Sequence, residues 1–326
     1  MSTLQRNVLR LICGALALAI LFAAPGARAF PEKPIRLVVP QPPGGVPDTI
    51  ARVLGNMLSK RLDWNVVVEN RPGAAGILAA ELVAKAPPDG HTLFIADYGA
   101  LAINPSLYAK LPYDPVKDFA PVTLAASGGL FLVTNAALPV HSVKELIAYI
   151  KANPGLPFGS AGNGTLHHLG LELFRLLAGV KVTHVPYKGA AQLVSALLSG
   201  DISVSLVALP SALPHVKTSK LRLLAVSEAK RSATLPDVPT IAEAGVPGYE
   251  IESGIGVVAP AATPKAVIQK LSGEMVRTLQ TPEMAGHLVP RGIHPVGSTP
   301  EQYAEKIRHE TAKYAKLVKA SGARVD

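Results

Sequence analysis

Aromatic residues and cysteine are scarce in this 326-residue sequence. Phe, Trp and Tyr together make up 5% of the chain, which disfavours a surface that stacks several bases or sugars on aromatic rings. The one cysteine, Cys13, lies in an N-terminal segment that we expect to be removed. Disulfides, cysteine nucleophiles and thiolate metal ligands are therefore excluded from the mature chain.

Long runs of basic residues are also missing. Lys and Arg are spread along the chain without a run of five, so we expect no nucleic-acid partner. The formal net charge of +9 falls to +6 when Arg6, Arg10 and Arg28 leave with the N-terminal segment. A mild positive field of this size favours the approach of anions. Hydrophobic residues make up 48% of the chain, enough to bury a core.

Residues 1–29 have the three parts of a secretory signal peptide. Arg6 and Arg10 give a positive start, residues 11–24 are almost entirely apolar, and a small-x-small cleavage site ends at Ala29. The alternative is an N-terminal membrane anchor, but the apolar run is shorter than the roughly 20 residues that a span needs. We therefore expect export to the periplasm with cleavage after Ala29.

Short apolar runs alternate with segments of helical periodicity along the mature chain. We expect strands at 34–40, 66–70, 92–96, 119–124, 130–134, 182–185, 202–206, 221–226 and 255–259. We expect helices at 50–62, 77–86, 143–150, 166–178, 192–199, 265–279 and 301–319, with Asp48 or Thr49 capping the first and Ser142 the third. This alternation predicts an α/β fold with a largely parallel sheet and helices on both faces.

The strand and helix pattern restarts in the middle of the chain, which predicts two α/β lobes. The chain is expected to cross between them near 125–130 and 250–256. Lobe 1 would then comprise 30–128 plus 253–326, and lobe 2 would comprise 129–252. Ligands bind beyond the carboxyl ends of strands in such sheets, so the two lobes would enclose the ligand in a cleft.

Two glycine-rich loops, each between a strand and a helix, are the strongest candidates for a binding site. The first is Pro42 to Asp48 (PPGGVPD) and the second is Gly159 to Thr165 (GSAGNGT). Both bring free amide N–H groups to a helix N-terminus, where the helix dipole favours an anion such as a carboxylate. They could instead be simple tight turns, but their corresponding places in two lobes favour a ligand role. Neither matches a nucleotide-binding motif.

Two further segments follow strands. In the segment 185–189 (VPYKG), Tyr187 could close over a ligand and Lys188 could attract an anion, or the segment could be a solvated turn with a packed tyrosine. Asp97 and Tyr98 form another candidate wall. A carboxylate at Asp97 would repel an anionic ligand. It could instead pair with a cation, cap a helix, or bind an amine or hydroxyl group.

No catalytic or metal-binding set emerges from the sequence. His167 and His168 are adjacent, so they cannot form an i, i+4 metal pair, and we expect each to be a packing or surface residue. Zinc-protease, nucleophile-elbow and paired-carboxylate patterns are absent. We expect a protein that is not an enzyme, with no cofactor and no metal.

Blocks of residues in order along the whole mature chain resemble the Bug family, the periplasmic substrate-binding proteins of tripartite tricarboxylate transporters. The blocks are 33–36 through 43–48, 67–73 (VVENRPG), 103–108 (INPSLY), 111–122 (LPYDPVKDFAPV), 160–165 (SAGNGT), 184–189 (HVPYKG), 209–215 (LPSALPH), 235–240 (LPDVPT) and 295–302. The resemblance implies a two-lobed Venus-flytrap fold of the periplasmic-binding-protein type. It also implies a monomer that closes on a small carboxylate and delivers it to membrane permease subunits.

Carried over by position, the resemblance assigns ligand contacts to both loops and their neighbours. These contacts are Gly44, Gly45, Asp48, Ser160, Ala161, Asn163, Thr165, Tyr187 and Lys188. The family tends to hold carboxylates with backbone amides, small hydroxyl groups and bridging waters.

Four places depart from the family pattern at the expected pocket walls. They are Gln41 for an aromatic residue, Asp97 with Tyr98 and Ala100 for a serine- and threonine-rich segment, Leu166 with His167 for small residues, and Val207 with Ala208 for a polar pair. Tyr98 and Leu166 would make part of the wall bulkier or more apolar, and loss of the polar pair at 207 and 208 would weaken binding of a ligand amine. Our hypothesis is therefore an aromatic or otherwise apolar monocarboxylate ligand.

Two other functions use the same fold. A receptor that senses its ligand for a two-component kinase has the same sequence features. A periplasmic hydrolase or isomerase would need a catalytic set that the sequence does not show.

Overall fold

The computed structural model describes residues 30–323 and residue 325. By its contacts the chain separates after Lys33, and the fold described here begins at Pro34. The expected signal peptide, residues 1–29, lies outside the described residues. No helix among the described residues has both the length and the apolar character that crossing a membrane requires.

The first part of the fold contains three short strands and their helices, followed by one long strand. Its elements are β1 (Ile35–Val39), α2 (Val46–Leu62), β2 (Val66–Asn70), η1 (Ala74–Gly76), α3 (Ile77–Ala84), β3 (Thr92–Asp97), the π-helical turn η2 (Gly99–Ile103), α4 (Asn104–Leu107) and β4 (Phe119–Asn135). The positions of β1, β2 and β3 agree with the sequence prediction, whereas β4 was predicted as two strands and the short elements η2 and α4 were not predicted.

The rest of the chain repeats the alternation and then returns. Its elements are α5 (Val143–Ala152), β5 (Leu156–Ser160), α6 (Leu166–Ala178), β6 (Val182–Pro186), α7 (Ala190–Ser199), β7 (Val204–Ala208), α8 (Leu209–Lys217), β8 (Leu221–Val226), β9 (Glu252–Pro260), α9 (Lys265–Leu279), α10 (Pro282–Leu288), η3 (Val289–Arg291), β10 (His294–Pro295) and α11 (Pro300–Ser321). Helices α8 and α10 were not predicted. Pro214 lies inside α8, and proline is a strong negative signal for a helix interior.

The start of α2 differs from the prediction. The helix is capped by Gly45, and not by Asp48 or Thr49. Pro47 fits the first turn because its missing N–H is not needed there. The prediction that Ser142 caps α5 is confirmed, since its side chain accepts a hydrogen bond from the N–H of Glu145.

The strands form one hydrogen-bonded path in the order β2-β1-β3-β9-β4-β7-β5-β6, with β8 and β10 also paired to β4. Strand β1 runs parallel to β2 and β3, and β5 runs parallel to β6 and β7. Strands β4 and β9 run antiparallel to each other, and β9 is also antiparallel to β3. The α/β prediction is confirmed, but the sheet is mixed because its two crossing strands are antiparallel. A fully buried strand reads as a continuous apolar run in either direction, so the sequence carries no signal for this.

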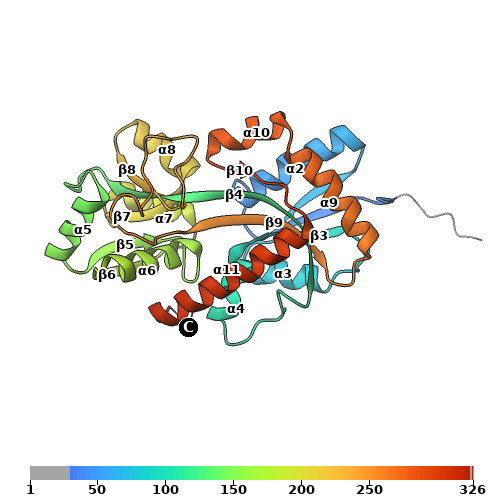
Figure 1. Cartoon of the computed structure of the whole chain (residues 1–326), viewed down its shortest axis with the longest axis horizontal. Coiled ribbons are helices and arrows are strands. Elements are labelled where there is room, and N and C mark those ends of the chain that lie inside the picture. Colours follow the sequence, from blue (N-terminus) through green and yellow to red (C-terminus); the bar gives the residue numbers. More distant parts are fainter. Residues whose placement is uncertain (1–29, 324, 326) are drawn as a thin grey trace, which may run out of the picture. The chain divides into compact units, whose positions relative to one another are not determined.

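Strand β4 continues through Gly128 and Gly129, where two separate strands were predicted (Figure 1). It pairs with β9 up to Gly129 and with β7 and β8 from Leu130 onward. Both glycines are required by close approach: a Cβ atom at Gly128 would lie 2.7 Å from the carbonyl oxygen of Gly292, and one at Gly129 would lie 2.6 Å from a carboxylate oxygen of Glu228.

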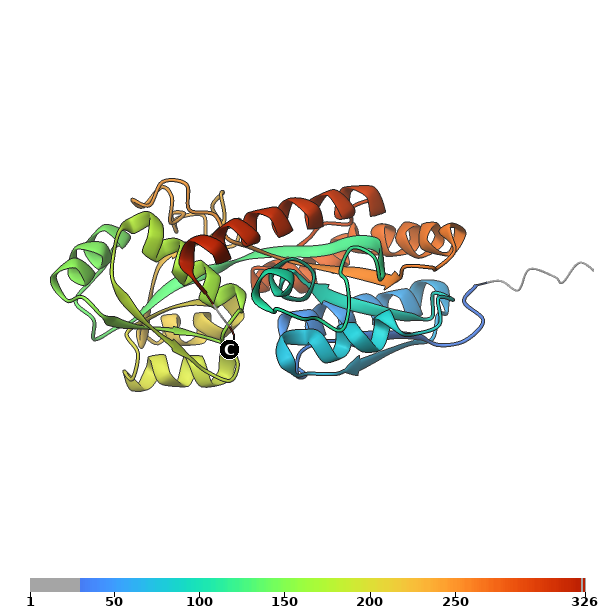
Figure 2. The same cartoon turned by 90° about the horizontal axis from the view of Figure 1, so that it is seen from below.

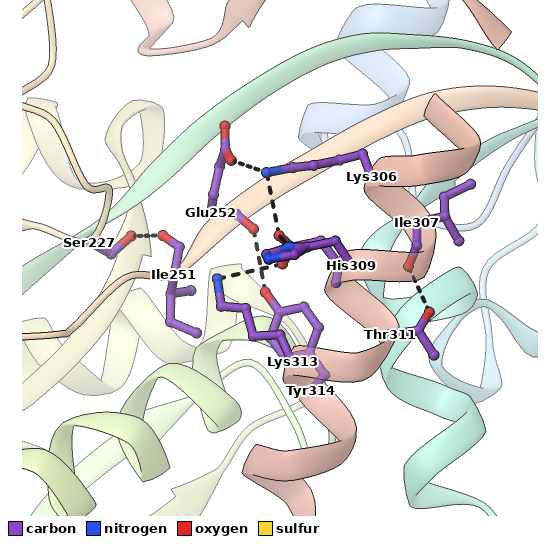
Figure 3. Close-up of polar contacts among 10 residues, drawn as sticks. Ser227, Ile251, Glu252, Lys306, Ile307, His309, Thr311, Lys313 and Tyr314 are labelled. Carbon is purple, nitrogen blue, oxygen red and sulfur yellow. Dashed lines mark hydrogen bonds and ion pairs between the residues drawn. The ribbon is translucent and has the colours of Figure 1, made fainter. Parts of the chain in front are cut away.

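Ser227, after β8, ties the crossing segments together. Its Oγ accepts a hydrogen bond from the N–H of Leu130 at 2.9 Å. It donates one to the carbonyl of Ile251 at 2.6 Å (Figure 3). Its backbone N–H and C=O bond the same two residues, each at 2.8 Å. The side chain is fully buried. One residue therefore fixes the register of β4 and the entry into β9.

Helix α11 lies along β4 and contacts α6 and η2 (Figure 2). The Nζ of Lys306 is 3.2 Å from Glu252 at the start of β9 and 3.4 Å from Glu310, which is 1% exposed (Figure 3). Lys313 approaches the other oxygen of Glu310 at 3.5 Å. These contacts attach the C-terminal helix to the start of β9.

The core of the described residues includes two clusters of buried side chains. The larger includes Phe94, Tyr98, Phe158, Tyr249 and Tyr303. The smaller packs α7 and α8 against the strands β4, β7 and β8. The loops after β1 and β5 lie at the carboxyl ends of parallel strands, where a binding site was predicted.

Candidate functional site

Asp48 shapes the first loop from the inside. Its Oδ2 accepts hydrogen bonds from the N–H of Gly44 at 2.9 Å and from Arg52 at 3.0 Å, and its Oδ1 accepts one from Asn70 at 2.9 Å. Burial acts to raise the pKa of Asp48, but the hydrogen bonds from Arg52, Gly44 and Asn70 outweigh it and lower this pKa below its ordinary value. The carboxylate is 3% exposed and has a structural role in the loop.

Arg52 and Asn70 are site-supporting residues that the sequence reasoning missed. The i, i+4 spacing of Asp48 and Arg52 on a helix was a usable signal. Asn70 gave a weaker one, since it ends the strand β2 next to the strand that precedes the loop. Its amide also donates to the carbonyl of Gln41 at 2.9 Å, so it bridges both ends of the loop.

Gln41 and Asp97 contact each other at the carboxyl ends of β1 and β3. The amide of Gln41 donates to Asp97 at 3.2 Å. The other oxygen of Asp97 accepts the N–H of Ala100, in the first turn of η2, at 3.0 Å. Burial raises the pKa of Asp97 in spite of these hydrogen bonds. Asp97 thus bonds the side chain of Gln41 and the backbone of the first turn of η2, although Tyr98 is the N-cap of that turn.

The N-terminus of α2 keeps unused donors. Gly45 supplies no side chain to cap it, and a Cβ atom there would lie 2.7 Å from the side-chain oxygen of Gln41. Within the described part of the chain, the N–H groups of Val46 and Asp48 have no hydrogen-bond partner. Together with the positive end of the helix dipole, they suit a carboxylate.

The second loop is organised by Ser160 and Thr165. The Oγ of Ser160 accepts the N–H of Gly162 at 3.1 Å and lies 2.6 Å from Nε2 of His184. Thr165 caps α6: its Oγ1 donates to the carbonyl of Gly162 at 2.7 Å and accepts the N–H of His168 at 3.4 Å. Gly162 has a φ of +134°, a conformation that other residues rarely adopt.

This loop also leaves donors free. The N–H groups of Ala161, Asn163, Leu166 and His167 form no hydrogen bond to any described residue. Asn163 is exposed, while Ala161 and Thr165 are half-buried. The loop therefore offers a second set of amides at a helix N-terminus, in the place after β5 that corresponds to the first loop after β1.

The segment around Tyr187 and Lys188 lies against the second loop. The N–H of Tyr187 donates to the carbonyl of Ser160 at 2.9 Å, and the N–H of Gly189 donates to that of Ala161 at 3.1 Å. The Tyr187 side chain packs against the smaller core cluster. Lys188 is exposed. The backbone of this segment thus supports the loop, and its lysine is accessible to solvent.

Tyr98 and Val207 lie in the core. Tyr98 is 2% exposed, and its ring fills the space beside Gly254, where a Cβ atom would come within 2.0 Å of it. Val207 is 1% exposed and belongs to the smaller core cluster. Leu166 packs against the larger cluster and is partly buried. The first two of these side chains have packing roles and leave the wall of the site to the loops.

Comparisons with known proteins place the chain among related receptors. Residues 50–323 match the model of the tripartite tricarboxylate transporter family receptor. BugT of Bordetella pertussis is 36% identical over 312 residues, covering 95% of this chain and 96% of BugT. An R. palustris protein solved with adipate is 37% identical with a TM-score of 0.85, covering 90% of this chain and 99% of that one. MatC from Rhodopseudomonas palustris, solved with bound malate, is 31% identical with a TM-score of 0.79, covering 89% and 100%.

Proposed function

Since the chain belongs to the tripartite tricarboxylate transporter receptor family, we propose that it captures a small dicarboxylate between its first and second loops. It is a solute-binding protein and not an enzyme, and the similar proteins of known structure are solute-binding proteins as well. The proposal concerns the identity of the ligand, the place where it binds and the membrane partner that receives it.

The observation that carries the proposal is the pair of helix N-termini with unused amides, at α2 and at α6. Each suits one carboxylate group, which favours a ligand with two such groups. Adipate and malate, the ligands solved with two similar proteins, are both dicarboxylates. The hypothesis of an apolar monocarboxylate has less support, because Tyr98 and Val207 belong to the core.

We further propose that lobe 1 (30–128 plus 253–326) and lobe 2 (129–252) close on the ligand by a hinge motion. The change of partner strands at Gly129 in β4, and the start of β9 at Glu252, support these boundaries. Glycine at 128 and 129 supports bending there, because glycine allows the widest range of backbone conformation. A monomer is the proposed form.

The proposed partners are the membrane permease subunits of a tripartite transporter, to which the receptor delivers its ligand in the periplasm. The family description supports the transporter, and the signal-peptide pattern of residues 1–29 supports export. Uptake of the ligand by vesicles that carry the permease should depend on added receptor. Uptake at the same rate without the receptor would contradict this part of the proposal.

Thermal melting and calorimetry of residues 30–326, refolded from denaturant to remove carried-over solute, test the ligand. Adipate and malate should raise the melting temperature, with about 2.7 kcal/mol of added stability at 100 times the dissociation constant. Benzoate and phenylacetate test the apolar monocarboxylate, and diamines test the charge preference. A shift with diamines and none with any carboxylate would overturn the proposal.

A further inference from the structure

Two histidine rings stack behind the second loop. His168 on α6 and His184 on β6 have ring centroids 3.9 Å apart and ring planes 5° from parallel. His168 is 5% exposed and His184 is partly buried. Each ring forms a hydrogen bond to the loop, His168 through Nδ1 and His184 through Nε2.

His168 holds the C-terminal half of the loop. Its Nδ1 accepts the N–H of Gly164 at 3.1 Å, so in the neutral ring the proton is on Nε2. Its own N–H reaches the hydroxyl of Thr165 at 3.4 Å. The pair resembles a capping box with histidine at the third helical position in place of glutamate, except that His168 accepts the N–H of Gly164, one residue before the N-cap Thr165. The bond turns the Gly164 amide inward.

His184 holds the N-terminal half. Its Nε2 lies 2.6 Å from the hydroxyl of Ser160, and the same hydroxyl accepts the N–H of Gly162. Ser160 is fully buried. The two rings therefore act on Gly162 and Gly164, the two loop glycines with positive φ.

We propose that the stacked rings of His168 and His184 are positioning residues of the carboxylate site, which in their neutral form keep the Gly162 and Gly164 amides turned inward and so direct the Ala161 and Asn163 amides at the ligand. This inference rests on the proposed function. It makes the shape of the loop depend on two side chains that do not contact the ligand.

The surroundings favour two neutral rings. Burial lowers the pKa of His168 to about 4, and burial together with the facing His168 lowers that of His184 to about 4, with Glu172 acting in the opposite direction. Glu172 is itself paired with Arg175 at 2.7 Å. On the same helix, burial lowers the pKa of His167 to about 4. A proton on Nδ1 of His168 would replace the acceptor that Gly164 needs.

Paired substitutions in the chain of residues 30–326 test the proposal by calorimetry with adipate at pH 7.5. His168→Asn and His184→Gln keep a polar atom where Nδ1 and Nε2 lie, whereas His168→Leu and His184→Leu remove it. We expect the leucine variants to raise the dissociation constant at least tenfold and the amide variants to stay within about threefold of wild type. His141→Leu changes an exposed histidine and is the matched control.

A spectroscopic measurement on wild type tests the proposal even if the leucine variants fold poorly. Imidazole ¹⁵N shifts of wild type should show His168 with its proton on Nε2, and the Gly164 amide should exchange slowly with solvent. Faster exchange of Gly164 is expected in His168→Leu but not in His141→Leu.

The outcomes separate this inference from the proposed function. If wild type binds adipate and the folded leucine variants bind it equally well, the rings do not position the loop. A proton on Nδ1 of His168 would also overturn the inference. If wild type binds no carboxylate, the proposed function fails, and the Gly164 exchange still decides whether the rings hold the loop.

Discussion

The hydroxyl of Thr165 has a counterpart far along the chain in Thr299. Both cap a helix, α6 and α11 respectively, and both accept an N–H from the third helical residue. Thr165 differs by its second bond, to the carbonyl of Gly162 in the candidate site. Alanine at either position should cost about 1 kcal/mol of stability through loss of the cap. We expect only Thr165→Ala to weaken carboxylate binding, as measured by calorimetry. Equal affinity in the two variants would remove Thr165 from the site.

Gly254 gives a second contrast at the scale of one residue. A Cβ atom there would lie 2.0 Å from the ring of Tyr98, which is buried and has little room to move. Gly254→Ala should destabilise the protein by about 1–3 kcal/mol, measured by urea unfolding. Gly286 in α10 has open space around it, so Gly286→Ala should leave stability unchanged or raise it by up to about 1 kcal/mol. A larger loss of stability in Gly286→Ala than in Gly254→Ala would contradict this packing.

Prediction from sequence was least informative about side-chain direction. Asp97 and Tyr98 were placed correctly at the end of a strand, but nothing in an apolar strand says which side chain faces solvent. Tyr98 and Val207 are buried in the core, and Asp97 accepts a hydrogen bond from the first turn of η2. The loops could be predicted because glycine marks conformations that other residues rarely adopt. The stacked histidines could not, since their contact joins residues 16 positions apart on different elements.

At the scale of elements, the crossing depends on the hydroxyl of Ser227. Its removal in Ser227→Ala leaves the buried N–H of Leu130 and one lone pair of the Ile251 carbonyl without this partner. A buried donor left without a partner costs about 1–3 kcal/mol. We expect the urea midpoint to fall by more than in Ser142→Ala, which removes a half-exposed helix cap worth about 1 kcal/mol. A smaller loss for Ser227→Ala would show that the crossing does not depend on this side chain.

The elements themselves were largely predictable, with instructive exceptions. Helices α2, α6, α9 and α11 have regular apolar spacing, and the prediction found each of them. Helices of four to nine residues that begin with proline near their first turn gave too short a pattern to detect, as α4, α8 and α10 show. Strand β4 was split because paired glycines normally mark a loop, whereas here they allow close approach in a crossing strand.

The stability of the whole molecule should depend on pH through two kinds of group, one whose stabilisation is lost as pH rises and one whose stabilisation is lost as pH falls. Burial and the nearby Glu252 raise the pKa of Glu228 to about 7, partly offset by the N–H of Gly129. Between its ordinary pKa and 7, the folded state keeps a proton that the unfolded chain has released, so this group's stabilisation is lost as pH rises through 7. The pKa values of His167, His168 and His184 are lowered to about 4, so their contribution is full above about 6.5 and is lost as pH falls toward 4.

Glu228→Gln separates these contributions. The variant cannot ionise, so at pH 8 it should be more stable than wild type by about 1–2 kcal/mol, and at pH 5 the two should differ little. Urea unfolding at both pH values measures this difference. Glu250→Gln, at an exposed glutamate, is the control and should change stability equally at both. A gain for Glu228→Gln at pH 5 as large as that at pH 8 would assign the effect to packing.

The position of β9 in the sheet has a consequence for how the chain folds. This strand lies between β3 and β4, yet 116 residues separate the end of β4 from its start. Until residues 252–260 arrive, β3 has an open edge that can pair with other chains. The central strand is thus added late, and such long-range closure slows folding. The growing chain is therefore most vulnerable to aggregation just before its last quarter becomes available for pairing, when a chaperone that covers strand edges would help most.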